Sequence, residues 1–194
     1  APSSGGRVLL DGVDIAGLRL QELRSKIAVV PQEPTMLPLS LKGNVGDTYT
    51  DAEVLTALEW CGLDARAVTQ KETLAEALAT QVVDGLLSVG QKQLLMAARA
   101  LVKRPKVLIL DECTASLDRR SADRLLDVIT EHSRDCTVLA IAHRLRFVSR
   151  SDRILVLETG EVLAFDTPAN LLADPSGYYS VNLRLEQQEE GAQG

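Results

Sequence analysis

Apolar residues along this chain follow two spacings, and the two alternate through its second half. Residues 107–110 form a continuous apolar run and residues 137–142 form a second one, as expected of parallel strands covered on both faces. Helical stripes adjoin these runs: Leu94, Leu95, Ala98, Leu101 and Val102 before the first, and Ala122, Leu125, Leu126 and Ile129 after it. This strand–helix–strand order predicts an α/β fold with a parallel sheet and right-handed crossovers.

The first thirty residues and the C-terminal part show shorter elements. We expect strands at residues 7–10 and 27–30, the second of them stopped by Pro31, with a helical segment between them. Two apolar runs around a turn at residues 158–160 predict a β-hairpin. We assign residues 1–182 to one domain and residues 183–194 to a polar tail, of which we expect residues 186–194 to be frayed or disordered.

Between the strand at residues 27–30 and the run at residues 107–110, the pattern becomes helical. Thr50 and Glu53 fit a capping box, in which each side chain binds the backbone N–H of the other residue. Apolar residues at helical spacing follow this box, and residues 73–80 are again helical in character. We interpret about residues 41–104 as a helical subdomain inserted into the α/β body.

Composition and charge narrow the classes of function. Aromatic residues make up only 3% of the 194 residues, so the core must consist mostly of Leu, Val, Ile and Ala. A formal net charge of -6 argues against a nucleic-acid partner, which favours a basic surface. No apolar run approaches the roughly 20 residues that span a bilayer. Cys61, Cys113 and Cys136 match no zinc motif, and we expect them to be buried, reduced thiols.

Two acids, Asp111 and Glu112, follow the apolar run at residues 107–110. Ligands of open parallel sheets bind beyond the carboxyl ends of the strands, so both acids face the expected crevice. Asp111 is placed to hold Mg²⁺ through a bound water, and Glu112 is placed to polarise an attacking water. Solvated acids also end many strands, so this pair by itself is weak support for a site.

A second group of candidates lies just before the predicted helix that contains Leu94. Ser88 and Gln91 fit a capping box, which a well-formed helix start alone would explain. Alternatively, this start presents backbone N–H groups and the positive end of the helix dipole to a phosphate. Gly90 would then leave room for the phosphate and Ser88 would donate to it, whereas capping alone gives no reason for Gly90.

His143 directly follows the run at residues 137–142, at the same sheet edge as Asp111 and Glu112. A lone histidine is more often structural or exposed. At this edge, however, it could contact a γ-phosphate and the group that positions the attacking water.

Together these residues resemble the ATP-binding cassette of ABC transporters over about residues 5–180. Residues 87–91 resemble the signature motif, with Val89 in place of a more usual Gly, and residues 107–112 resemble the Walker B strand with its catalytic glutamate. Residues 116–118 resemble the D-loop, and residues 30–34 resemble the Q-loop. His143 resembles the switch histidine. The segments Ser-Val-Gly-Gln, Cys-Thr-Ala-Ser-Leu-Asp and Ile-Ala-His-Arg-Leu are most similar to the second nucleotide-binding domain of the multidrug-resistance-associated (C) subfamily of exporters.

This resemblance implies a P-loop NTPase-like sheet core, ATP and Mg²⁺ as cofactors, and hydrolysis of ATP coupled to export of organic anions, conjugates and drugs. It implies catalytic roles for Glu112, His143 and Gln32, nucleotide contacts from Ser88, Gly90, Gln91 and Asp118, and metal ligation by Asp111 and Gln32. The implied partners are a second cassette, packed head to tail, and transmembrane domains at the cytoplasmic face of a membrane, with no nucleic acid.

One departure from the family pattern concerns the phosphate loop. No G-x-x-x-x-G-K-[ST] sequence occurs in the 194 residues, and residues 2–5 resemble the segment that follows this loop in the family. We therefore expect an N-terminally truncated cassette that is inactive by itself, because the loop supplies most of the phosphate binding.

Two alternatives to the exporter cassette are a non-transport ABC protein, of the DNA-repair or the ribosome-associated kind, and a degenerate cassette without catalysis. A DNA-repair or chromosome-structure ATPase would carry long coiled coils where this chain has only about 55 residues between Gln32 and Leu87. A ribosome-associated factor usually has Asp or Glu after the switch histidine, where this chain has Arg144. A degenerate, non-catalytic cassette would not be expected to retain Glu112, which has no evident packing role.

Overall fold

The computed structural model describes residues 5–142 and 148–192. The chain forms two compact units that meet in sequence between Leu139 and Ala140. Each unit is described by itself below. Among the described residues, no helix combines the length and the apolar character that crossing a membrane requires.

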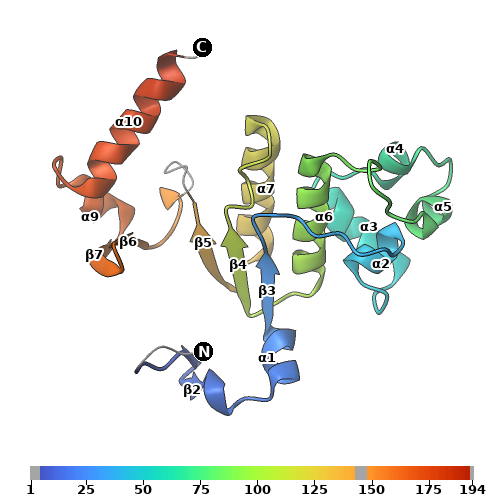
Figure 1. Ribbon diagram of the computed structural model, residues 1–194, viewed down its shortest axis with the longest axis horizontal. Coiled ribbons are helices and arrows are strands. Elements are labelled where there is room, and N and C mark those ends of the chain that lie inside the picture. Colours follow the sequence, from blue (N-terminus) through green and yellow to red (C-terminus); the bar gives the residue numbers. More distant parts are fainter. Residues whose placement is uncertain (1–4, 143–147, 193–194) are drawn as a thin grey trace. The chain divides into compact units, whose positions relative to one another are not determined.

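A three-stranded sheet contains two strands of the first unit and a third strand that continues past the boundary at Leu139 (Figure 1). Its strands are β3 (Ile27–Val30), β4 (Val107–Asp111) and β5 (Thr137–Ile141), in the order β3-β4-β5. Strands β3 and β4 are parallel, with Ile27 opposite Val107 and Val30 opposite Leu110. These elements confirm the predicted parallel sheet.

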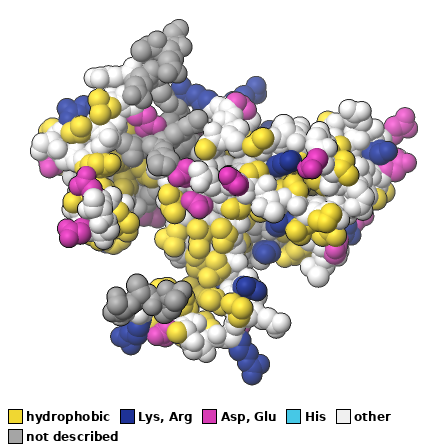
Figure 2. All heavy atoms as spheres, viewed as in Figure 1, with side chains coloured by type: hydrophobic (Ala, Val, Ile, Leu, Met, Phe, Trp, Pro, Cys, Tyr) yellow, Lys and Arg dark blue, Asp and Glu magenta, His cyan; other side chains and the backbone are white. Residues whose placement is uncertain are grey.

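The burial of β5 differs from the prediction. We expected this strand to be covered on both faces, but all five of its residues are exposed. In contrast, Val107, Leu108 and Leu110 of β4 are buried. Both β3 and β5 lie at edges of this sheet, but β3 buries Ala28 and Val30 because helix α6 (Val89–Val102) packs against it. Hydrophobic side chains accordingly reach the surface over this part of the molecule (Figure 2).

Short elements precede the sheet. Strands β1 (Leu9–Leu10) and β2 (Val13–Asp14) pair as an antiparallel hairpin, followed by a 3₁₀ turn (Ile15–Gly17) and helix α1 (Leu20–Lys26). The expected early strand and the helical segment before β3 are therefore present.

Helices fill the stretch between β3 and β4. They are α2 (Leu41–Val45), α3 (Asp51–Trp60), α4 (Ala65–Thr69), α5 (Leu74–Ala79) and α6 (Val89–Val102). The capping box of Thr50 and Glu53 starts α3 as predicted, and α6 packs against both α3 and β3. Buried Asn44 donates from Nδ2 to the carbonyls of Leu37, Leu39 and Ser40. These elements agree with a helical insertion, and its bounds at about residues 41–104 stay a prediction.

Helix α7 (Arg119–His132) follows β4 and buries Ala122, Leu125 and Ile129, three members of the predicted stripe. Near its C-terminus, the His132 ring stacks on Trp60 of α3 with the ring centroids 3.7 Å apart. The Cys61 and Cys113 thiols are buried, and burial raises the pKa of Cys61 to about 12. Cys136 is partly exposed, so the expectation of three buried thiols is wrong for this residue.

The second unit contains the predicted hairpin of β6 (Ile154–Glu158) and β7 (Glu161–Asp166), followed by α9 (Pro168–Leu172) and α10 (Tyr178–Ala192). Ile154, Val156 and Tyr179 form its core. The expectation of a frayed tail is wrong for the backbone through Ala192, because α10 continues to that residue. Leu, Arg, Gln and Glu have favourable helix propensities, which explains why polar composition does not end the helix.

Candidate functional site

The parallel register of β3 and β4 brings two predicted site segments to one edge of the sheet. Val30 lies opposite Leu110, so Gln32 and Glu112 leave the sheet side by side. The Gln32 amide Nε2 donates to the Glu112 carboxylate Oε2 at 3.0 Å, although 80 residues separate them in the chain. Asp111 is the last residue of β4. We refer to Gln32, Asp111 and Glu112 as the sheet-edge site.

Glu112 has a strained backbone. Its φ of 46° lies in the left-handed region, which costs a residue with a Cβ roughly 1–2 kcal/mol. A turn follows, in which the Ala115 N–H donates to the Glu112 carbonyl at 3.0 Å. Non-glycine residues in such conformations cluster at functional sites, because the surrounding structure must hold them there. The turn directs Glu112 to the edge where Gln32 meets it.

The start of α6 has the geometry of a complete capping box. The Gln91 backbone N–H donates to Ser88 Oγ at 3.2 Å, and the Ser88 N–H donates to Gln91 Oε1 at 2.9 Å. This reciprocal pair satisfies two of the backbone donors at the helix start. Both side chains are therefore occupied by a structural role in this state.

Gly90 has a packing role that the sequence did not indicate. A Cβ placed on Gly90 would lie 3.3 Å from Leu117 Cδ2 and 3.6 Å from the Ser116 carbonyl oxygen. The start of α6 therefore packs closely on the loop before α7, and a side chain at this position would push Leu117 away. This contact gives a reason for glycine that is independent of any phosphate.

Asp118 also acts as a helix cap. Its Oδ1 accepts from the Ser121 backbone N–H at 3.0 Å and its Oδ2 accepts from the Ser121 hydroxyl at 2.6 Å. These hydrogen bonds, with the hydroxyl contributing most, hold the pKa of the Asp118 carboxyl below its usual value. We refer to Ser88, Gly90 and Gln91 at α6, with Asp118 at α7, as the helix-start residues.

Gln93 is a residue at this edge that the sequence reasoning missed. Its side chain is fully buried on α6, and its Nε2 donates to the Pro31 carbonyl at 2.9 Å. The signal available in the sequence was its position four residues before Ala97 on the apolar face of the helix, where a polar residue needs a partner.

His143, the remaining predicted catalytic residue, lies outside the described residues. Within those that are described, no group of three or more His, Cys, Asp or Glu side chains could hold a metal ion. The sheet-edge site still suits Mg²⁺, which keeps several waters and needs only one or two protein carboxylates together with phosphate oxygens. Asp111 is the side chain available for that purpose.

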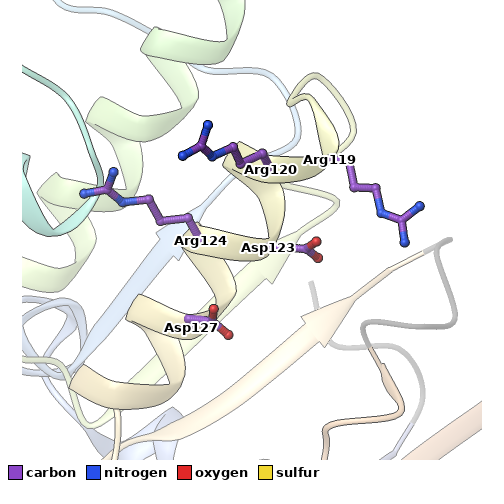
Figure 3. Close-up of a pocket in the computed structure, with 5 residues that line it drawn as sticks. All are labelled: Arg119, Arg120, Asp123, Arg124 and Asp127. Atoms are coloured by element: carbon purple, nitrogen blue, oxygen red, sulfur yellow. The ribbon is translucent and has the colours of Figure 1, made fainter.

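A pocket elsewhere on the first unit contains none of these residues. Arg119, Arg120, Asp123, Arg124 and Asp127, all from α7, line it. Figure 3 shows Arg120 and Arg124 pointing to one side of the helix and Arg119 to the other. The lining combines arginines with two aspartates, so the pocket is not a uniformly positive site for an anion.

Comparison with known proteins gives a consistent family. The family model described as "ABC transporter" matches residues 1–115. The maize "ABC transporter C family MRP4" is 38% identical over 178 residues, which are 91% of this chain and 12% of that protein. The human "ATP-binding cassette sub-family C member 2" is 36% identical over 179 residues, with the same two coverages.

A solved structure of a bacterial Atm1-family ABC exporter with ATP bound is similar in fold. Its TM-score is 0.83 at 31% sequence identity, and the match covers 94% of this chain and 32% of that chain. This chain thus spans about 12% of the length of the curated relatives above. The parallel sheet with its sheet-edge site, the family model and these relatives agree: the chain belongs to the ABC transporter family, as a cassette similar to those of the C-family exporters.

Proposed function

We propose that this chain is the ATP-binding and ATP-hydrolysing part of an exporter, and that hydrolysis takes place at the sheet-edge site. The observation that carries the proposal is the 3.0 Å hydrogen bond between Gln32 and Glu112, two residues from distant segments, beside Asp111. The similar bacterial exporter supports ATP as the proposed ligand, because its solved structure has ATP bound.

The residues of this chain have separate roles in the proposed reaction. When bound, Mg²⁺ would neutralise charge that develops on the phosphates. Asp111 would hold the ion, and Glu112 would accept a proton from the attacking water or orient it. Gln32, already bonded to Glu112, would fix that carboxylate and offer its amide oxygen to the ion. We assign contact with the γ-phosphate to His143, which lies outside the described residues.

The helix-start residues serve a nucleotide held by a second cassette. A helix start presents N–H groups and a partial positive charge, which attract a phosphate whichever subunit supplies it. In this proposal Ser88, Gly90 and Gln91 cover the partner's nucleotide, and Asp118 contacts it from the loop before α7. The two cassettes pack head to tail, so each completes the site of the other.

The remaining parts of the proposal concern the longer protein. The relatives' names include ABC transporter C family members, and the chain matches about 12% of the length of those described above. We propose that transmembrane domains accompany the cassette, that it works at the cytoplasmic face, and that the cargo is an organic anion or conjugate. Because the 194 residues contain no phosphate-loop motif, we expect the chain alone to bind Mg–ATP weakly.

Magnesium-dependent hydrolysis by the full-length protein tests this proposal. Asp111→Asn should reduce ATP hydrolysis roughly 10²-fold and raise the Mg²⁺ concentration needed for half-maximal activity, since it removes the charged ligand. Asp84→Asn, an exposed acid in the loop before α6, is the matched control and should behave like wild type. Equal activity and equal Mg²⁺ dependence in the Asp111→Asn variant would show that hydrolysis does not use this site.

A further inference from the structure

We propose that Gln93 is a positioning residue, which holds Pro31 and thereby couples helix α6 to the geometry of Gln32 and Glu112. This inference rests on the proposed function for its catalytic consequence, although the structural coupling itself can be measured without ATP. Three observations on the described part of the first unit carry it: a buried hydrogen bond, a shared peptide group, and an unsatisfied buried oxygen.

The hydrogen bond joins two elements that each carry part of the proposed machinery. Gln93 lies on α6, the helix that Ser88 starts, and its Nε2 donates to the Pro31 carbonyl at 2.9 Å. The Gln93 side chain is 0% exposed, so water does not compete for this bond. Sixty-two residues separate the partners in the chain, which makes the bond a tertiary contact rather than a local turn.

The Pro31 carbonyl belongs to the peptide group that joins Pro31 to Gln32. Because a peptide group is planar, fixing its oxygen also fixes the orientation of the Gln32 N–H and Cα. The Gln32 side chain begins at that Cα and donates to Glu112 Oε2 at 3.0 Å. A continuous path of two hydrogen bonds and one rigid peptide group therefore runs from α6 to the Glu112 carboxylate.

The second polar atom of Gln93 suggests that the amide is kept for more than packing. Among the residues that the structure describes, Oε1 of Gln93 is buried and has no hydrogen-bond partner. A buried acceptor without a donor destabilises the fold, so an apolar side chain of the same size would suit the core better. Retaining Gln93 makes sense if its Nε2 has a task at Pro31.

The path gives α6 a way to influence hydrolysis. A phosphate engaged at Ser88 and Gln91 would bind the start of the same rigid helix that carries Gln93 only five residues further on. Any shift of the helix axis would move Nε2 and, through the Pro31–Gln32 peptide, the amide that orients Glu112. Gln93 would thus make the sheet-edge site respond to occupancy of the α6 start.

The test compares Gln93→Met with wild type in the full-length protein. Met keeps the volume of the side chain and removes its donor. Without nucleotide, we expect the backbone amides within residues 32–36, which are those of Gln32, Glu33, Thr35 and Met36, to exchange hydrogen about fivefold faster, which corresponds to one lost hydrogen bond. In turnover, we expect kcat to fall roughly 10- to 100-fold with little change in KM for ATP, because the groups that act on the water are misaligned.

Thr69→Val is the matched control. It also replaces a buried polar group by an apolar one of equal size, but the Thr69 hydroxyl donates within α4 to the Ala65 carbonyl at 2.7 Å. This variant should leave both the exchange of residues 32–36 and kcat unchanged. If Gln93→Met does not fold, Gln93→Asn is used instead. The Asn side chain keeps the amide but is one methylene shorter, so it does not reach the Pro31 carbonyl.

The outcomes separate this inference from the proposed function. Faster exchange at residues 32–36 supports the structural coupling even if the wild-type protein hydrolyses no ATP. Exchange and kcat equal to wild type in the folded variant would overturn the inference while leaving hydrolysis at Glu112 intact. Failure of both variants to fold would also overturn it, because Gln93 would then serve stability alone.

Discussion

The sheet-edge site and the helix-start residues differ in how their side chains are held. Gln32 and Glu112 come from segments 80 residues apart and bind each other, and Glu112 has a left-handed backbone just after the end of β4. The Ser88 and Gln91 side chains, by contrast, bind each other's backbone N–H at the start of α6. Asp118 caps α7 in the same manner.

This difference decides how a mutation at each place should be interpreted. At the sheet edge, a substitution that keeps the shape of the side chain, such as Glu112→Gln, should reduce activity while leaving the caps of the helices intact. At the helix starts, each substitution also removes a cap or a close packing contact. Function can be assigned there only against a control that removes the same structural contribution elsewhere.

Among the helix-start residues, the largest effect is expected from Gly90→Asp. The new carboxylate would stand beside the phosphate of the nucleotide held by the partner cassette, and we expect hydrolysis at that site to fall roughly 10²-fold or more. Measurement requires a mixed dimer or a paired-cassette transporter with photo-crosslinkable ATP. The variant should lose the nucleotide that is bound at the Walker B acids of the partner cassette, and it should keep the nucleotide at its own Asp111 and Glu112.

Gly90→Ala is the control that separates charge from crowding. Its methyl group would meet Leu117 Cδ2 at the same 3.3 Å as the Asp variant's Cβ, but it adds no charge. We expect a much smaller loss of hydrolysis. Equal losses in the two variants would assign the effect to packing on Leu117. Loss of nucleotide only at the site that contains this chain's own Asp111 and Glu112 would contradict the proposal that Gly90 serves the partner's nucleotide.

A smaller effect is expected from Ser88→Ala, which tests whether the α6 cap also serves nucleotide. Loss of an N-cap hydroxyl should lower the free energy of unfolding by about 1 kcal/mol. Thr50→Ala removes the same kind of capping box from α3 and should cost a similar amount. Chemical denaturation and ATP hydrolysis should both be measured. Only Ser88→Ala should also slow ATP hydrolysis. Equal rates of hydrolysis in the two variants would show that Ser88 acts only as a helix cap.

The smallest effect concerns the pH dependence of the Asp118 cap. Its pKa in the folded chain is lowered from the ordinary 3.8, so its stabilisation is fully present above that value and is lost as the pH falls through the lower folded value. Asp118→Asn keeps a capping oxygen and loses the charge. The variant should be less stable than wild type at pH 7, and the difference should shrink below about pH 4. A difference that is constant with pH would exclude the charge as its cause.

Local sequence rules predicted most elements of the fold. The apolar runs predicted β3 with its correct ends and β4 to within one residue, because Pro31 ends the first run and β4 continues through Asp111. The capping boxes at Thr50 and Ser88 appear as expected, since they depend only on residues three positions apart. The family resemblance assigned roles to both Gln32 and Glu112, and the parallel register of β3 and β4 brings them to one edge of the sheet.

Features that depend on tertiary packing were not predicted. The reason for Gly90 lies in Leu117, and the partner of Gln93 is Pro31, neither of which is a neighbour in sequence. The apolar composition of β5 predicted burial, but its residues are exposed, because burial depends on which elements cover a strand. The helix through Ala192 shows that polar composition does not by itself decide backbone order.

The most direct test of the central claim is a paired measurement on Glu112→Gln in the full-length protein. We predict ATP hydrolysis slower by roughly 10²–10⁴-fold, with ATP still bound and the free energy of unfolding unchanged, because Gln keeps the shape of the side chain but cannot accept the proton. Glu76→Gln, at an exposed capping position of α5, is the matched control and should hydrolyse ATP like wild type. Hydrolysis by Glu112→Gln within a few-fold of wild type would contradict the account.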